Sequence, residues 1–224
     1  EEKKYDVLVI GAGAAGMRAA IAASEEGASV CLVSKSLLGK AHTVMAEGGA
    51  AAALGNADER DNWKVHFRDT IKGGKHLNNW KMAKIHAEQA PERILELEKW
   101  GAVFDRTKDG KINQRNFGGH RFPRLAHVGD RTGLEIIRTV QDKVIHQDNI
   151  DIFMECTVAK IITEKNQVVG ALAYYRNNGD IVAILAKAVV VATGGIGKAY
   201  RVTSNSWEYT GDGHSLAYLA GADL

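Results

Sequence analysis

A glycine-rich turn, Gly11-Ala12-Gly13-Ala14-Ala15-Gly16, directly follows the apolar run 5–10. The run is long enough for a buried parallel strand. After the turn, the alanine-rich segment 17–24 is typical of a helix closed by Gly27, and residues 29–33 form a second predicted strand. Strand, turn, helix and strand within the first 33 residues predict a βαβ unit, and therefore an α/β fold built on a parallel sheet.

Each glycine of this turn has a separate role in a dinucleotide-binding unit. Gly11 permits the tight turn, Gly13 lets the backbone approach a pyrophosphate, and Gly16 lets the helix pack closely on the strand. The helix N-terminus offers N–H groups and a partial positive charge to the phosphates. Residues 34–36 (Ser-Lys-Ser) stand where NAD-binding folds have an acidic residue for the ribose, although a serine hydroxyl can also bond a ribose oxygen.

The C-terminal half predicts a different continuation from that of an NAD-binding fold. Residues 150–187 alternate short β-rich runs with turns, including the hairpin signal at 177–180, and residues 188–195 give a buried strand that ends in a glycine turn. A βαβ unit, a long insertion, a β-meander and a returning strand are typical of the FAD-binding domain of large flavoproteins. The pattern therefore favours FAD over NAD.

The insertion, at about 58–147, is predicted to be helical. Its expected helices are 58–71, 79–89, 91–100 with Pro91 in the first turn, and one from a capping box at Thr132 and Glu135 to about residue 146. Residues 102–131 are expected to be rich in loops, and their segment 115–133 holds four arginines and two histidines. Arginine forks suit carboxylates and phosphates, and a solvated basic loop is the alternative.

Composition excludes several classes of protein. The net charge of +2 gives no sign of a nucleic-acid partner, and no apolar stretch reaches the ~20 residues of a membrane span. Cys31 and Cys156 fall in predicted strands and are expected to be small core residues. Neither a CxxC pair nor metal-ligand spacing of histidines occurs, so no iron–sulfur cluster or other metal site is predicted in this chain, and the helical histidines are interpreted as structural.

Six blocks of the sequence occur together, and in the same order, in a known family. The blocks are GAGAAG (11–16), SKSLLGKAHTVMAEGGAAAALGN (34–56), NFGGH (116–120), DRTG (130–133), ATGG (192–195) and TSNSWEYTGDGH (203–214). Over essentially its whole length the chain resembles the flavoprotein subunits of succinate dehydrogenase and fumarate reductase. This family usually has serine at the position of Ser34.

The resemblance implies that FAD is bound covalently through His42, at the 8α position of the isoalloxazine ring. Such a bond withdraws electron density and raises the flavin potential, so that the flavin can take a hydride from succinate. The alternative is a histidine that merely lies near the pyrophosphate. The other residues implied to line FAD are Gly11, Ala12, Gly13, Ala14, Ala15, Gly16, Ser34, Lys35, Ser36, Lys40, Thr43, Ala46, Gly48, Gly49, Val158, Ala192, Thr193, Gly194 and Asp212.

The resemblance also implies a dicarboxylate site. Glu47, Gly48 and Gly49 would lie near the flavin and a substrate carboxylate, and Phe117 would press on the dicarboxylate and twist it towards the transition state. The family often has glutamine where Glu47 stands. From the residues alone, Asp212 is expected to cap the helix that it opens, and its carboxylate could also bond a cofactor hydroxyl.

The family normally continues into an HPTG segment, a capping domain with a proton-shuttling arginine, and a C-terminal helical domain. These parts are absent from the 224 residues, so we expect this segment to hold no complete catalytic set and to turn over nothing alone. An iron–sulfur subunit that accepts the electrons is implied, with membrane anchor subunits beyond it. The implied location is peripheral, on the cytoplasmic or matrix face of an energy-transducing membrane.

Three alternatives remain open. L-Aspartate oxidase shares the fold and similar blocks but lacks the linking histidine at position 42. A soluble fumarate reductase with non-covalent FAD is disfavoured for the same reason. A non-catalytic flavin-binding module is the alternative from another class.

Overall fold

The computed structural model describes residues 2–223, which form two compact units. The first unit contains the described residues up to Met45 and those from Val140 onward, and the second is Ala46–Thr139. Helix α4 (Thr132–Ile145) contributes residues to both units. None of the helices in residues 2–223 is both long enough and apolar enough to cross a membrane.

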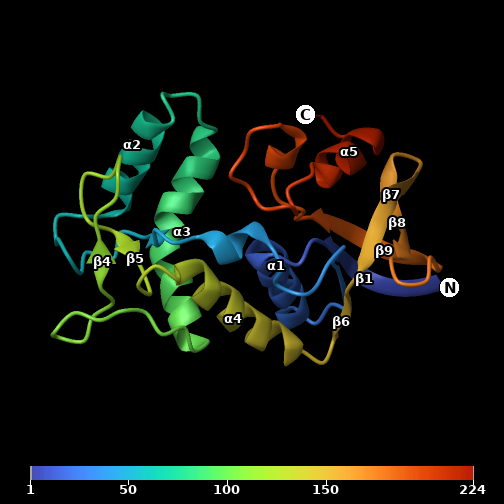
Figure 1. The fold of residues 1–224 in the computed structure, drawn as a ribbon, viewed down its shortest axis with the longest axis horizontal. Helices are drawn as coiled ribbons and strands as arrows, with labels where there is room; N and C mark the ends of the chain where they lie inside the picture. Colours follow the sequence, from blue (N-terminus) through green and yellow to red (C-terminus); the bar gives the residue numbers. More distant parts are fainter. Residues whose placement is uncertain (1, 224) are drawn as a thin grey trace. The chain divides into compact units, whose positions relative to one another are not determined.

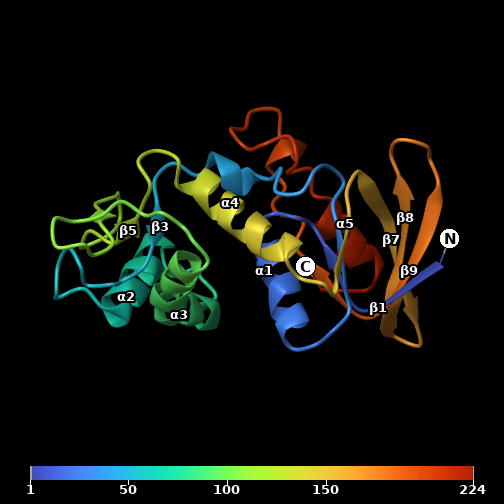
Figure 2. The same ribbon diagram turned by 90° about the horizontal axis from the view of Figure 1, so that it is seen from below.

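A six-stranded mixed sheet organises the first unit (Figure 1). Its order is β6-β2-β1-β9-β8-β7, in which β6, β2, β1 and β9 are parallel and β9, β8 and β7 are antiparallel. Figure 2 shows β7, β8 and β9 side by side. The strands are β1 (Glu2–Ile10), β2 (Val30–Val33), β6 (Ile150–Phe153), β7 (Cys156–Glu164), β8 (Gln167–Tyr175) and β9 (Ile181–Val191).

The predicted βαβ unit is confirmed. Helix α1 (Ala14–Glu25) connects β1 to β2, and the two strands pair in parallel with Val7 opposite Val30 and Ile10 opposite Val33. All four residues of β2 are buried, as is expected for a strand covered on both faces. A short 3₁₀ turn (His42–Met45), a second one (Gly197–Ala199) and helix α5 (Asp212–Leu219) complete this unit.

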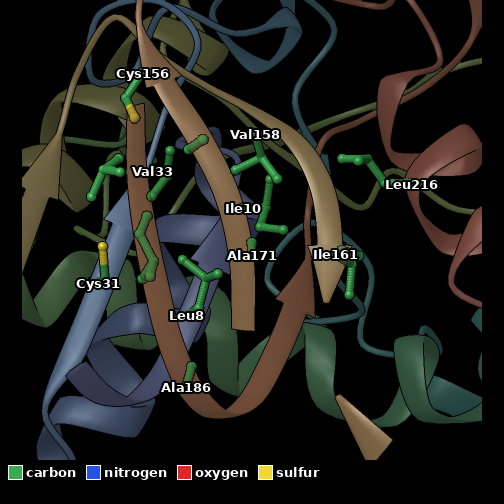
Figure 3. Close-up of a cluster of buried hydrophobic side chains, with 13 residues drawn as sticks. Leu8, Ile10, Cys31, Val33, Cys156, Val158, Ile161, Ala171, Ala186 and Leu216 are labelled. Carbon is green, nitrogen blue, oxygen red and sulfur yellow. The ribbon is translucent and has the colours of Figure 1, made fainter. Parts of the chain in front are cut away.

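The core of this unit combines residues of β1 and β2 with residues of the meander strands β7, β8 and β9 and with Leu216 of α5. Figure 3 shows Leu8 and Ile10 of β1 beside Val33 of β2, with Val158 and Ile161 of β7 nearby. Both cysteines, Cys31 and Cys156, are free and fully buried in this cluster, as the sequence predicted. Burial raises the pKa of Cys156 to about 11, so its thiol stays protonated near pH 7.

Two strands differ from the predicted boundaries. β6 (Ile150–Phe153) pairs in parallel with β2 instead of joining the meander, which therefore begins at Cys156. The returning strand predicted within 188–195 is the second half of β9, which ends at Val191. β9 pairs with β8 through its first half and with β1 along nearly all its length. One long strand, β9, thus joins the meander to the parallel strands. The apolar pattern of the sequence does not show where the pairing of β9 with β8 ends.

The second unit contains two helices and a small sheet. Helices α2 (Trp63–Gly73) and α3 (Trp80–Lys99) pack against each other (Figures 1 and 2). The segment 102–131, which was expected to be rich in loops, contributes two strands to a three-stranded antiparallel sheet of order β3-β5-β4. These are β3 (Ala50–Ala51), β4 (Gln114–Arg115) and β5 (Leu125–Ala126).

The two helices expected at 79–89 and 91–100 are one. Pro91 lies inside α3, although proline removes a backbone hydrogen bond in a helix interior. Ala83, Ala87, Ala90 and Ile94 recur at intervals of four, three and four residues and are all buried. Burial of this continuous stripe stabilises an unbroken helix, because a break at Pro91 would turn half of the stripe away from the core.

One predicted helix start and one predicted cap were also wrong. α2 begins at Trp63 and not at Asp58, because Asn62 caps it by accepting hydrogen bonds from the N–H groups of Lys64 and Val65. The capping box at Thr132 and Glu135 does not form. The Thr132 hydroxyl instead accepts from the N–H of Val128, and the Glu135 carboxylate accepts from the N–H of Val103 and from Arg138.

Candidate functional site: a nucleotide cradle and a separate arginine-held loop

A pocket of the first unit opens where parallel strands end. Its walls include Ile10 at the end of β1, Val33 and Ser34 at the end of β2, and the residues after β9. Because β1, β2 and β9 are parallel, their carboxyl ends meet at one edge of the sheet. Ligands of open α/β sheets bind in such a crevice.

The glycine turn at this edge leaves no room for side chains. A Cβ on Gly11 would lie 2.4 Å from the carbonyl oxygen of Ala192, and Gly11 has a φ of +112°. A Cβ on Gly16 would lie 1.7 Å from the carbonyl oxygen of Gly11. Gly11 therefore allows the turn to lie against Ala192, and Gly16 allows α1 to lie against the carbonyl group of Gly11, in agreement with the separate roles predicted for them.

Helix α1 points an uncapped N-terminus into this turn. Its N-cap residue is Gly13, and no side chain accepts a hydrogen bond there. The first N–H groups of a helix have no partner within the helix and attract anions together with the helix dipole. Backbone donors and glycine surfaces on one wall fit the pyrophosphate of a dinucleotide such as FAD.

A small polar cluster lies at another wall of the pocket. The Nζ of Lys35 donates to the hydroxyl of Thr210 at 2.6 Å and to the carboxylate of Asp212 at 2.7 Å. Partial burial tends to raise the pKa of Asp212, but the hydrogen bonds from Lys35 and Thr210 and the charge of Lys35 lower it overall. Asp212 is therefore an anionic hydrogen-bond acceptor at the pocket wall.

Asp212 does not cap α5, contrary to the sequence-based expectation. It is the first helical residue, and the N-cap is Gly211, whose φ of +82° places it in the left-handed region. A Cβ on Gly213 would lie 1.9 Å from the Thr193 hydroxyl oxygen, so α5 packs closely on the 192–194 segment. The carboxylate of Asp212 is thus turned to Lys35 and Thr210 and not to the helix backbone.

His42 lies beside this pocket, between the lining residues Ala41 and Thr43. Its half-buried ring faces the ring of Tyr209, with 4.6 Å between the ring centroids and 36° between the ring planes. Its Nδ1 accepts a hydrogen bond from the N–H of Ser206 at 3.2 Å. The Nδ1 side of the His42 ring is therefore engaged by backbone.

Most residues predicted to line FAD lie around this one pocket: Gly11, Ala12, Gly13, Ala14, Ala15, Ser34, Lys35, Ser36, Lys40, Thr43, Val158, Ala192, Thr193, Gly194 and Asp212. Gly16 and His42 adjoin it without lining it, and Ala46, Glu47, Gly48 and Gly49 belong to the second unit. The sequence reasoning missed Tyr209, Glu208, Thr157 and Leu216 as lining residues. Tyr209 lies within the TSNSWEYTGDGH block, so that block was the signal available.

In the second unit, Gly48 lies against Phe117. A Cβ on Gly48 would lie 3.4 Å from Cε2 of the Phe117 ring, which is itself exposed. Arg115 holds this place: its Nε donates to the carbonyl oxygen of Gly48 at 2.7 Å, its Nη2 donates to that of Glu47, and its Nη1 pairs with Asp130 at 3.0 Å. The predicted substrate-side residues are thus gathered around an arginine whose role the sequence did not show.

A buried ion pair lies elsewhere in the second unit. Arg124 is fully buried and donates two hydrogen bonds to the carboxylate of Asp61 and one, at 2.9 Å, to Asp69. His66, buried nearby, contacts the rings of His86 and His120. Burial, and then the charge of Arg124, lowers the pKa of His66 to about 4, so His66 is neutral near pH 7.

Comparisons with known proteins agree with this geometry. The family described as FAD binding domain matches residues 6–224. One subunit of the fumarate reductase (CoM/CoB) of Methanothermobacter marburgensis is 42% identical over 220 residues, which cover 98% of this chain and 40% of that protein. The succinate dehydrogenase flavoprotein subunit of Rickettsia bellii is 38% identical over 229 residues, which cover 99% of this chain and 38% of that protein.

A solved structure agrees as well. Mycobacterium smegmatis Sdh1 in complex with UQ1 superposes with a TM-score of 0.96 at 58% identity, over 98% of this chain and 39% of that one. The chain thus spans about two fifths of the length of the proteins it matches. The chain belongs to the FAD-binding domain family, and its homologues include flavoprotein subunits of succinate dehydrogenase and fumarate reductase.

Proposed function

We propose that this chain is the FAD-binding part of a flavoprotein that interconverts succinate and fumarate, with FAD linked covalently to His42. The observation that carries the proposal is the position of His42, which stands between two pocket-lining residues with its Nδ1 engaged by the Ser206 N–H. Since the chain spans about two fifths of its relatives, the activity is proposed for the whole protein.

Within the chain, the residues divide the work of binding. The turn Gly11–Gly16 and the N-terminus of α1 would hold the pyrophosphate, and Ser34 would meet the ribose. The ion pair between Lys35 and Asp212 fixes both side chains at the pocket wall. The carboxylate of Asp212 would also accept a hydrogen bond from a hydroxyl group of the cofactor. When bound, FAD would supply the hydride-accepting ring.

In the second unit, the residues around Arg115 would serve the dicarboxylate. Arg115 fixes the carbonyl groups of Glu47 and Gly48, so the peptide N–H groups of Gly48 and Gly49 are held in place for a substrate carboxylate. Phe117, packed against Gly48, would limit the conformations of the dicarboxylate. The base that removes the substrate proton is assigned to parts of the protein outside these 224 residues.

Electron delivery to an iron–sulfur subunit, itself linked to membrane anchor subunits, completes the proposal, with the flavoprotein peripheral on the cytoplasmic or matrix face. Support comes from the names of the homologues and of the matching structure, which belong to succinate dehydrogenases and fumarate reductases. Affinity purification of the tagged full-length protein from its native membranes should recover an iron–sulfur protein in equal amount. Recovery of the flavoprotein alone would contradict the partner assignment.

The test of the cofactor assignment is made on the full-length protein. It is denatured in acid and digested, and the peptide that contains His42 is measured by mass spectrometry. A mass increased by that of FAD supports the proposal. Flavin released wholly into the supernatant contradicts it and favours L-aspartate oxidase or a soluble fumarate reductase. Reduction of a dye by succinate, but not by L-aspartate, then separates the substrate classes.

A further inference from the structure

A second pocket lies in the other unit and is lined mainly by cationic side chains. Arg68 and Lys72 come from α2, Lys75 from the turn after it, and His120 and Arg121 from the segment that follows the Gly118-Gly119 pair. Its single acidic lining residue is Asp69. No residue that lines the glycine-turn pocket of the first unit also lines this pocket, so the two pockets are distinct.

The positive charge of this pocket is not balanced within the described residues. The ion pairs of residues 2–223 include none made by Arg68, Lys72, Lys75 or Arg121. Asp69 is already occupied, because its Oδ2 accepts from Arg124 and from the N–H of Arg121, each at 2.9 Å. Because Arg124 is shared between Asp69 and Asp61, at most one negative charge, that of Asp69, faces the four lining cations Arg68, Lys72, Lys75 and Arg121.

The spacing of these exposed cations adds a modest repulsion among them, which solvent screens in part. Arg68 and Lys72 are four residues apart on α2, where like charges share one face of a helix and destabilise it. Lys75 adds a third charge from a backbone with a positive φ of 54°, a conformation that a lysine adopts rarely. A bound anion would relieve the repulsion among the three.

The end of α2 would ordinarily repel an anion through its free carbonyl groups, but three of its last four carbonyl oxygens, those of Thr70, Ile71 and Lys72, accept hydrogen bonds here. The carbonyl oxygen of Thr70 accepts from Gly74 N–H and from the Asn78 side chain, and that of Lys72 accepts from Lys75 N–H. His120, on the opposite segment, has an inaccessible Nδ1 with no hydrogen-bond partner among the described residues. The pocket thus presents cationic donors, and three of the last four carbonyl groups of α2 already accept hydrogen bonds.

We propose that this pocket is a second ligand site, which binds a small multivalent oxyanion through Arg68, Lys72, Lys75 and Arg121. Phosphate groups and clustered carboxylates share the chemistry that such a site recognises, with guanidinium forks and ammonium groups around oxygen atoms. Gly119, two residues after Phe117, is one of the lining residues of the pocket. Asp69 accepts hydrogen bonds from both the backbone N–H of Arg121 and the buried side chain of Arg124. The proposal is independent of the flavin assignment.

The test uses the full-length protein with its flavin bound, so that the nucleotide cradle is filled. Inorganic phosphate and, in a separate series, citrate are titrated by calorimetry at constant ionic strength set with chloride. We expect saturable binding of at least one of them, and the stronger of the two shows whether phosphate or clustered carboxylates are preferred. The double variant Lys72→Gln/Lys75→Gln should bind that anion at least tenfold more weakly.

The matched control is Lys64→Gln/Lys81→Gln, which removes two exposed lysines of α2 and α3 that do not line the pocket. It should bind like the wild type, within twofold. Equal weakening in both double variants would show a general charge effect and overturn the proposal. Absence of saturable binding of both anions at millimolar concentrations would overturn it too. Neither outcome bears on flavin at His42, so the two proposals fail separately.

Discussion

The backbone N–H of Ser206 donates a 3.2 Å hydrogen bond to Nδ1 of His42. A neutral imidazole that accepts at Nδ1 carries its proton, or a substituent, on Nε2. A histidine alkylated at Nε2 keeps a lone pair on Nδ1, which is the group that the Ser206 N–H requires. The contact therefore fits a flavin linked through Nε2, and the Tyr209 ring beside His42 restrains the plane of the imidazole.

Replacing His42 should separate attachment of the flavin from binding. We expect the His42→Ser protein to bind FAD through the pocket of the first unit, because His42 does not line that pocket, but to release all of it in acid. Acid precipitation followed by the absorbance of pellet and supernatant measures the two fractions. His146→Ser, an exposed histidine remote in sequence from the blocks, is the control and should keep its flavin in the pellet.

The glycine turn allows a direct test of its packing. Gly16→Ala should destabilise the fold by ~3 kcal/mol, because its Cβ would have to displace the Gly11 carbonyl group. Urea unfolding measures the change. Gly73→Ala is the matched control, since a Cβ there meets no atom within 4 Å and alanine is the better helix former. Equal stability of the two variants would contradict the close approach.

The sequence was sufficient for the nucleotide half of the structure because short-range patterns determine it. The turn 11–16, the strands at its sides and the hairpin at 177–180 each depend on neighbours within a few residues, and all three are present. Most residues predicted to line FAD surround one pocket for the same reason, because parallel strands bring their ends to one edge.

Short-range sequence patterns could not predict the contacts between residues that are far apart in the sequence. Pro91 signalled a new helix, yet the buried stripe through α3 outweighed its local preference. Asp212 looked like a helix cap, but Lys35, 177 residues away in sequence, holds its carboxylate. The contacts of Arg115 with Glu47 and Gly48 span 68 and 67 residues, and no local motif announces them.

Arg115 provides a prediction about the substrate side. Arg115→Lys keeps the charge but loses the planar fork that bonds two carbonyl groups at once. With the Glu47–Gly48 backbone released, KM for succinate in the full-length protein should rise about tenfold while flavin content stays unchanged. Arg106→Lys, which alters an arginine that bonds Glu98 and the Gly110 carbonyl, is the control and should leave KM at its wild-type value.

The Arg124–Asp61 pair should carry much of the stability of the second unit. Arg124→Met removes a fully buried guanidinium and leaves the buried carboxylate of Asp61 without its cation. Breaking such a pair costs about 3–5 kcal/mol, which urea unfolding at pH 7 would detect. Arg60→Met breaks the exposed pair with Asp58 and should leave stability unchanged, since solvent screens it. Similar losses in both variants would contradict the contrast in burial.

Buried His66 should make stability depend on pH below neutrality. Because its pKa falls from the ordinary 6.5 to about 4 in the folded protein, the unfolded chain binds a proton there that the folded chain excludes. The free energy of unfolding should therefore fall as pH decreases from about 6.5 towards 4. The groups that influence His66 are Arg124, His86 and His120, which oppose its protonation, and Asp69, which favours it.

The variant His66→Phe keeps a buried ring of similar size and cannot take up the proton. Urea unfolding at several pH values between 7 and 4 (about the range set by the two pKa values) should show a shallower decline, by about one proton per molecule, than in the wild type. His146→Phe serves as the reference for loss of a single exposed histidine. Parallel profiles for His66→Phe and the wild type would mean that His66 is not held neutral by its surroundings, and that the buried arginine does not govern this cluster.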